Sequence, residues 1–244
     1  MLSYDAPGSL KGQDSATATS LASTIKAAAA VNNASFKSIA SNGTTMMSSQ
    51  TKVQSPAQTR AHAHTHILLV TGPAGCGKTT VAEHLAASLN MPYIEGDLYH
   101  TTANIEKMRA GIPLTDADRW DWLTILREES IRRINQGSAG VIVTCSALKR
   151  KYRDVIRVAA YYDHHILIHF IYLDAPEEVL LQRVGARQGH YMGANMVHSQ
   201  LDILEVPSQD ETDVTTIDVS RDIDEVVVTA LDQVSQFMTS NGTL

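Results

Sequence analysis

Along residues 65–244, short apolar runs alternate with longer amphipathic segments. Five short runs are rich in apolar residues, and three of them are almost continuously apolar, which is typical of parallel strands covered on both faces. The predicted strands are 66–71, 91–96, 139–146, 165–173 and 214–220. Amphipathic segments separate them, as crossover helices would. The predicted helices are 78–89, 101–110, 117–136, 148–161, 176–187, 194–205 and 222–239. The pattern predicts one α/β domain over residues 65–244.

The first 64 residues differ in composition from the rest of the chain. Ser, Ala, Thr, Asn and Gln dominate them, and no periodic apolar stripe occurs. We therefore predict a disordered, low-complexity leader over residues 1–64. The leader carries three net positive charges and the remainder nine net negative charges, which gives −6 for the whole chain. An acidic body argues against general binding to nucleic acid or to an anionic membrane.

The composition allows two hypotheses about where in the cell the protein is located. The leader is rich in Ser and poor in acids, as organelle import sequences are, but its basic residues are mostly Lys. No run approaches the roughly 18 apolar residues that a membrane span needs, and no signal peptide opens the chain. We expect a cytoplasmic protein, with organelle targeting as the alternative. The two cysteines, Cys76 and Cys145, lack metal-ligand spacing and are predicted to be reduced thiols.

The segment TGPAGCGKTT, residues 71–80, lies between the first predicted strand and the first predicted helix. It fits the pattern GxxxxGK[ST], in which glycines let backbone amides wrap a polyphosphate. Lys78 would contact the β and γ phosphates, and the Thr79 hydroxyl would bind Mg²⁺. The predicted nucleotide-binding residues are Gly72, Pro73, Ala74, Gly75, Cys76, Gly77, Lys78, Thr79 and Thr80. ATP and Mg²⁺ are the predicted cofactors.

Carboxylates near the strand ends indicate what is done with the bound phosphate. Asp97 follows the second predicted strand, and ligands of parallel sheets bind beyond the carboxyl ends of the strands. There it could accept a proton from an attacking hydroxyl or bind Mg²⁺; a turn or N-cap aspartate is the alternative. Asp174 ends the apolar run HFIYLD, as a Walker B acid would, but no second acid follows it. The guanine-reading motif of GTPases is absent from the sequence.

Three further blocks behind the phosphate loop resemble the gluconate kinases, or gluconokinases. They are EGDLYHTTANIEKMRAGIPLTDADRWDWL (95–123), TCSALKRKYRDVIR (144–157) and RVGARQGHYMGANMVHSQLDILEVP (183–207). The resemblance covers about residues 66–238. It implies a P-loop kinase fold related to shikimate kinase, with a five-stranded parallel sheet of order 2-3-1-4-5, helices on both faces and a lid. It also implies transfer of the ATP γ-phosphoryl group to the 6-hydroxyl of D-gluconate, which feeds the pentose phosphate pathway.

The same resemblance assigns roles to two arginines of the predicted lid. Arg187 would close over the phosphates and act in catalysis with Lys78 and Asp97, while Arg183 would lie against the adenine ring. The two arginines are four residues apart on one predicted helix face. An ordinary solvated helix face is the alternative.

A sugar acid presents one carboxylate and a row of hydroxyls, so its site should combine cations with hydrogen-bonding groups. Lys149 and Arg153 are four apart in a predicted helix and are expected to share a face near the strand ends. With Asp97, the candidate substrate contacts are His100, Arg119, Lys149 and Arg153; ordinary ion pairs are the alternative for the basic residues. The family usually has proline where this chain has Asp121, which makes the aim of Arg119 less certain.

Two other functions stay open at the level of sequence. One is a related P-loop kinase that phosphorylates another sugar acid or polyol, and the other is an ATP-binding sensor without catalysis. Kinases of this type often form homodimers, but the sequence does not decide this. His62, His64 and His66 alternate along a predicted extended segment, which suits either a metal site or a linker into the first strand.

Overall fold

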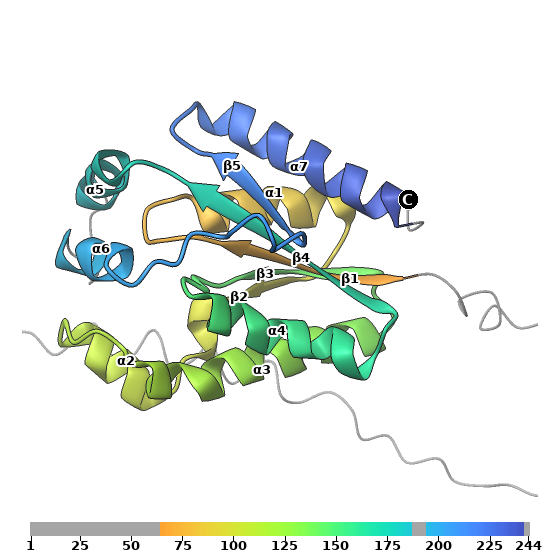
Figure 1. Cartoon of the computed structure of the whole chain (residues 1–244), viewed down its shortest axis with the longest axis horizontal. Helices are drawn as coiled ribbons and strands as arrows, with labels where there is room; N and C mark the ends of the chain where they lie inside the picture. The colour runs from red at the N-terminus through yellow and green to blue at the C-terminus, as the bar shows by residue number, and fades with distance from the viewer. Residues whose placement is uncertain (1–63, 187–193, 242–244) are drawn as a thin grey trace, which may run out of the picture. The chain divides into compact units, whose positions relative to one another are not determined.

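The computed structural model describes residues 64–186 and 194–241. The predicted leader, apart from its last residue, therefore lies outside the described residues. The strands are β1 (Thr65–Thr71), β2 (Tyr93–Glu95), β3 (Gly140–Thr144), β4 (Ile166–Asp174) and β5 (Val214–Asp218). They form one parallel sheet in the order β2-β3-β1-β4-β5 (Figure 1). The fold class and strand order expected from the sequence are confirmed.

Helices fill the connections between the strands. They are α1 (Lys78–Leu89), α2 (Thr102–Arg109), α3 (Asp116–Asn135), α4 (Arg150–Tyr162), α5 (Glu177–Ala186), α6 (Ala194–Leu201) and α7 (Ile223–Ser240), with a short 3-10 turn η2 (Gly96–Tyr99) after β2. Each predicted element is present, and the differences lie at the ends. α4 begins two residues later than predicted, and α6 ends four residues earlier than predicted. In the part of the chain that the structure describes, no helix is long and apolar enough to cross a membrane.

The central strand β1 is buried on both faces because its side chains alternate between two cores. Leu68 and Val70 belong to a core that includes residues of α1 and α7. Ile67 and Leu69 belong to a second core, which includes residues of α3 and α4. Figure 1 shows α1 and α7 over one face of the sheet and α3 and α4 over the other. Each fully buried side chain of this kind contributes roughly 1.5–3 kcal/mol.

A capping box fixes the start of α3. The Thr115 hydroxyl accepts from the Asp118 amide, and the Asp118 carboxylate accepts from the Thr115 amide at 2.8 Å. These bonds satisfy amides that a first helical turn leaves without partners. The helix therefore begins at Asp116, so Asp121, in its second turn, does not determine where the helix starts. This start makes Arg119 the fourth residue of the helix.

Because the strands are parallel, their carboxyl ends meet at one edge of the sheet. The segments that follow β1, β2 and β3 at this edge are the phosphate loop 72–77, η2 and residues 145–149. Such an edge is where open α/β sheets bind ligands. The predicted site residues 72–77, Asp97 and Lys149 lie in these three segments.

Candidate active site

The phosphate loop is shaped by the close approach of α5. Gly75 has a φ of 86°, a left-handed conformation that residues with side chains rarely adopt. A Cβ atom at this position would lie 2.9 Å from Val184 Cγ2 and 3.0 Å from the Leu180 carbonyl oxygen. Both the backbone conformation at position 75 and the lack of space for a Cβ atom there therefore require glycine. α1 begins at Lys78, directly after the loop, so its positive end faces the loop.

The donors of the loop have partners within the protein. Lys78 Nζ donates to the carbonyl oxygens of Gly72 and Pro73 at 3.0 and 2.9 Å. The Ala74 amide donates to Gln200 Oε1 of α6 at 2.7 Å. A phosphate chain that binds Lys78 would replace the bonds of its ammonium group to the two carbonyls. The geometry is that of a phosphate site whose donors are already oriented.

Glu95 is a site residue that the sequence reasoning missed. Its Oε2 accepts from Thr79 Oγ1 at 3.2 Å, and its Oε1 accepts from Thr144 Oγ1 at 2.6 Å. The Tyr93 hydroxyl also donates to Glu95; burial and this hydrogen bond raise the pKa of Tyr93. The available signal was an acid at the end of a strand, two residues before Asp97.

Thr79 and Glu95 offer the oxygen donors that Mg²⁺ prefers. Within the described residues, no group of three or more His, Cys, Asp and Glu could hold a metal ion by itself. This agrees with the usual way of binding Mg²⁺, through one or two carboxylates together with substrate phosphates and water. Nothing in the described part of the chain supports a metal site at His64 and His66, and His62 lies outside it.

The close packing of Gly96 against β3 fixes the position of the next residue, Asp97. A Cβ atom on Gly96 would lie 1.9 Å from the Thr144 carbonyl oxygen, so only glycine lets β2 end this close to β3. Trp122 Nε1 donates to the Gly96 carbonyl at 2.8 Å. The Asp97 side chain remains 56% exposed. Desolvation raises the pKa of Asp97; the charge of Lys78 lowers it and that of Glu95 raises it.

His100 lies beside Asp97, and the charge of Arg119 acts on His100. The His100 ring stacks on Trp122 with centroids 4.0 Å apart, and its Nε2 is 4.0 Å from Asp97 Oδ1. Burial, and secondly the charge of Arg119, lower the pKa of His100 to about 4. The ring is therefore neutral at pH 7. Arg119 donates to the Thr115 carbonyl at 3.1 Å and to the Tyr152 hydroxyl at 3.4 Å.

Lys149 is the N-cap residue of α4 and is paired with the carboxylate of Asp116. Its Nζ donates to Asp116 Oδ1 at 3.1 Å, and Lys151 and the Tyr152 hydroxyl donate to the same carboxyl group. These hydrogen bonds hold the pKa of Asp116 well below its usual range. Lys149 and Arg119 both lie near the Tyr152 ring, at 5.8 and 5.4 Å from its centroid. Two cationic side chains and the Asp116 carboxylate thus surround Tyr152.

Arg153 is placed elsewhere, and the expectation that it contacts substrate needs correction. Its side chain is 2% exposed and donates to both Glu211 oxygens, at 2.7 and 2.5 Å. It also donates to the Ala147 and Glu205 carbonyls. The expectation assumed that Lys149 and Arg153 share a helix face, but α4 begins only at Arg150. Arg153 therefore has a structural role, and we leave it out of the proposed substrate site.

The remaining candidates lie around the nucleotide side of the site. Arg183 Nη2 donates to the Val219 carbonyl at 2.7 Å, just beyond the end of β5. Arg187 lies outside the described residues. Asp174, the last residue of β4, accepts from the Tyr172 hydroxyl at 3.3 Å. Cys76 and Cys145 are buried free thiols, and burial raises the pKa of both, that of Cys145 to about 12. They are therefore protonated at neutral pH.

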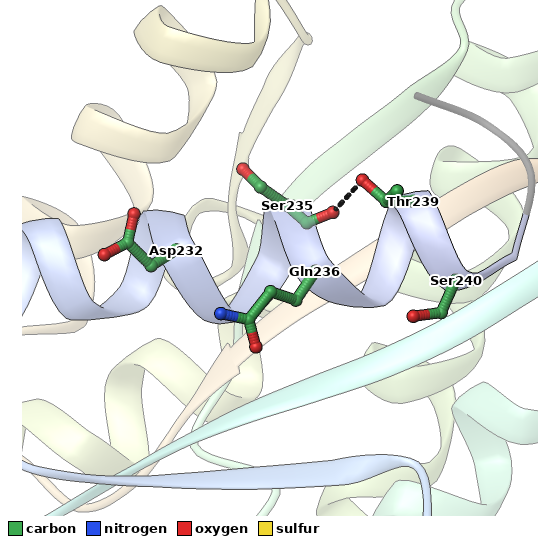
Figure 2. A pocket seen from close by; sticks show the side chains of 5 residues that line it. All are labelled: Asp232, Ser235, Gln236, Thr239 and Ser240. Atoms are coloured by element: carbon green, nitrogen blue, oxygen red, sulfur yellow. Dashed lines mark hydrogen bonds between the residues drawn. The ribbon is translucent and has the colours of Figure 1, made fainter.

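A shallow depression of about 450 Å³ lies along α7 (Figure 2). It is lined by Asp232, Ser235, Gln236, Thr239 and Ser240. Phe237, on the same stretch of helix, packs against His66 at the start of β1. The depression thus lies near the opposite end of β1 from the phosphate loop. It contains none of the candidate site residues.

A phosphate loop after the central strand, together with two carboxylates at the end of β2, one of which accepts from Thr79, defines a P-loop kinase. A family model described as an AAA domain matches residues 67–206, and one described as a Rad17 P-loop domain matches residues 26–107. Comparison with related proteins identifies the particular family. The chain is 46% identical to a probable gluconokinase of Schizosaccharomyces pombe, over 72% of this chain and 91% of the relative. The chain belongs to the gluconokinase family.

Two further comparisons agree with this assignment. The thermosensitive gluconokinase of Escherichia coli is 39% identical, over 64% of this chain and 80% of the relative. The crystal structure of a gluconokinase from Sinorhizobium meliloti 1021 is 37% identical and has a TM-score of 0.63, covering 73% of this chain and 97% of that one. The similarity thus extends over nearly the whole length of that structure.

Proposed function

We propose that this protein transfers the γ-phosphoryl group of ATP to the 6-hydroxyl of D-gluconate and forms 6-phospho-D-gluconate. The names of the relatives, which match over most of their length, support the substrate. The geometry supports the reaction class. Phosphoryl transfer asks the protein mainly for positioning and for positive charge around the transferring oxygens.

The contact between Thr79 and Glu95 carries the proposal. Their oxygens are 3.2 Å apart, which joins the phosphate loop to the end of β2. Asp97 follows two residues later, and the charge of Lys78 acts on its pKa. The group that would hold the phosphate and the group that would receive the hydroxyl proton therefore lie at one point of the sheet edge.

The phosphate side of the site would work through Lys78, Thr79 and Glu95. Lys78 would leave the Gly72 and Pro73 carbonyls and bind the β and γ phosphates. The Thr79 hydroxyl and the Glu95 carboxylate would hold Mg²⁺, directly or through water. When bound, Mg²⁺ would neutralise charge on the phosphate oxygens. Arg183 against the adenine and Arg187 over the phosphates stay predictions.

The acceptor side would work through Asp97, His100, Arg119 and Lys149. Asp97 would accept the proton of the 6-hydroxyl, and its raised pKa makes the carboxylate a stronger base. Neutral His100 can hydrogen-bond to sugar hydroxyls. Arg119 and Lys149 supply positive charge for the sugar carboxylate. That carboxylate would compete with Asp116 for Lys149.

A coupled assay of ADP release tests the proposal. Gluconate is compared with other aldonic acids, shikimate and nucleoside monophosphates, and mass spectrometry identifies the product that has gained one phosphate. In Asp97→Asn, kcat with gluconate is expected to fall by about 10² or more, the usual scale for a positioned base, while ATP affinity stays within a few-fold. Asp232→Asn, an exposed change on α7, is the matched control and should retain full turnover.

Three outcomes would overturn parts of the proposal. Turnover with another acceptor and none with gluconate would replace the substrate. Tight ATP binding with no phosphorylated product would indicate a nucleotide sensor. Normal turnover in Asp97→Asn would remove Asp97 from the mechanism.

A further inference from the structure

The hydroxyl of Thr144, the last residue of β3, contacts two successive residues at the end of β2. Its Oγ1 donates to Glu95 Oε1 at 2.6 Å and accepts from the Gly96 amide at 3.1 Å. Thr144 lies opposite Glu95 in the ladder between the two strands, and it is 2% exposed. One buried hydroxyl therefore holds both the Glu95 carboxylate and the residue that precedes Asp97.

Tyr93 supplies a second donor to the same carboxylate. Its hydroxyl donates to Glu95 Oε2 and lies 3.4 Å from Thr144 Oγ1. Tyr93 and Glu95 are two residues apart in β2, so their side chains lie on the same face of the sheet. Burial, and secondly the hydrogen bond to Glu95, raise the pKa of Tyr93. The phenol therefore keeps its proton and remains a donor at neutral pH.

The two donors fix how the Glu95 carboxylate is oriented. Oε1 is held by Thr144, while Oε2 is held by Tyr93 and also accepts from Thr79 Oγ1 at 3.2 Å. A glutamate side chain without such partners has several rotatable bonds and loses conformational entropy when it binds an ion. Donors that hold a ligating carboxylate in advance reduce this loss and orient its remaining lone pairs.

We propose that Thr144 and Tyr93 are positioning residues of the active site, which hold the Glu95 carboxylate beside Thr79 for the metal that accompanies ATP. Thr144 also fixes the Gly96 amide, and thereby the backbone that carries Asp97. The inference deepens the proposed function and rests on it in one respect, namely that Glu95 contributes to Mg²⁺ binding. Both residues act through Glu95 and neither is assigned a contact with substrate.

Calorimetric titration of the full chain with ATP over a series of Mg²⁺ concentrations tests this inference. Thr144→Val keeps the shape of the side chain and removes the hydroxyl. It is expected to raise the Mg²⁺ concentration needed for tight ATP binding by about tenfold, the scale for loss of a group that supports a metal ligand. Tyr93→Phe leaves the Thr144 bond in place, so a rise of about two- to tenfold is expected.

Two further variants serve as matched controls. Thr144→Ser retains the hydroxyl and is expected to stay within about twofold of the wild-type Mg²⁺ dependence. Thr215→Val is the same substitution in β5, where the hydroxyl is 2.8 Å from His169 Nε2, and it should match the wild-type protein.

Two readouts separate positioning from a merely structural role. ATP binding without Mg²⁺ should be unchanged in Thr144→Val and Tyr93→Phe, because both residues act through the metal ligand; general damage to the phosphate loop would weaken it. In a Glu95→Gln background, Thr144→Val should add less than about twofold to the shift in Mg²⁺ dependence, since the group through which it acts is already lost.

Unchanged Mg²⁺ dependence in folded Thr144→Val and Tyr93→Phe would overturn the inference, as would shifts that Thr144→Ser shares or that add in full to Glu95→Gln. Urea unfolding shows whether each variant is folded, and Tyr93→Phe decides alone if Thr144→Val is not. If Glu95→Gln left the Mg²⁺ dependence unchanged, the metal role of Glu95 would fail and the inference with it. Failure of the wild-type protein to bind ATP would instead refute the proposed function as a whole.

Discussion

Replacing Glu211 by glutamine removes one charge from an ion pair that is almost completely withdrawn from water. The Glu211 and Arg153 side chains are 1% and 2% exposed, and two hydrogen bonds of 2.7 and 2.5 Å connect them. Arg157 Nη2 donates to the same carboxylate at 2.7 Å. In Glu211→Gln, the neutral amide cannot compensate the buried Arg153 guanidinium. We therefore expect a large loss of stability.

Two estimates of this loss of stability agree in magnitude. Removing one partner of a buried ion pair typically costs about 3–5 kcal/mol. Hydrogen bonding to Arg153, the largest cause, lowers the pKa of Glu211 to about 2, a change worth about 3 kcal/mol at neutral pH. For a domain of this size, 1 kcal/mol changes Tm by roughly 2–4 °C, so Glu211→Gln is expected to lower Tm by roughly 6–20 °C.

Urea unfolding at several pH values measures the effect. Because the pKa of Glu211 is depressed by folding, its contribution is fully present above its ordinary pKa and is lost as the pH falls from about 4.5 to about 2. The difference between wild type and Glu211→Gln should therefore shrink across this window. Arg132→Met is the control: this arginine is 53% exposed in its pair with Glu129, and its loss should cost less than about 1 kcal/mol.

If Glu211→Gln lowered the free energy of unfolding by less than about 1 kcal/mol at pH 7, the reasoning would be refuted, since the ion pair would then not stabilise the fold. A stable variant with a strongly raised KM for gluconate would refute the structural role itself. Arg153 would then return to the substrate site.

The other predictions concern the metal and the effect of acid. Glu95→Gln is expected to raise the Mg²⁺ concentration needed for tight ATP binding by about tenfold or more, because an amide replaces an anionic ligand; calorimetry over a Mg²⁺ series checks this, and an unchanged Mg²⁺ dependence contradicts it. Burial lowers the pKa of His66 and of His169 to about 4, so stability should fall from pH 6.5 towards 4 as the unfolded chain binds more protons. His169→Gln should flatten this urea-unfolding profile, and an equally steep profile would contradict the prediction.

Hydrophobic periodicity sufficed to predict the elements, and the resemblance supplied their order in the sheet. Local signals were reliable where the physics is local: the phosphate loop follows β1 directly, and Asp97 follows β2 within two residues. The start of α4 was less certain because Lys149 has extended backbone angles that the basic run KRKYR does not reveal. Arg153 has a different role from the one predicted because its guanidinium is buried and pairs with Glu211.

The missed contacts depend on residues that are distant in sequence. The contacts of Glu95 with Thr79 and with Thr144, which is 49 positions away, are visible only in the structure. Arg153 finds its carboxylate 58 positions away in Glu211. No periodicity or spacing encodes such pairs, because they form only when segments distant in the sequence pack together.

The stacking of His100 on Trp122 gives the acceptor side an intrinsic optical probe. The chain contains two tryptophans, and the indole of Trp122 is 2% exposed, in ring contact with His100 and bonded to the carbonyl that precedes Asp97. Any molecule that displaces or polarises His100 changes the electronic surroundings of that indole. Fluorescence emission can therefore follow binding beside His100 in real time, without a label and without turnover.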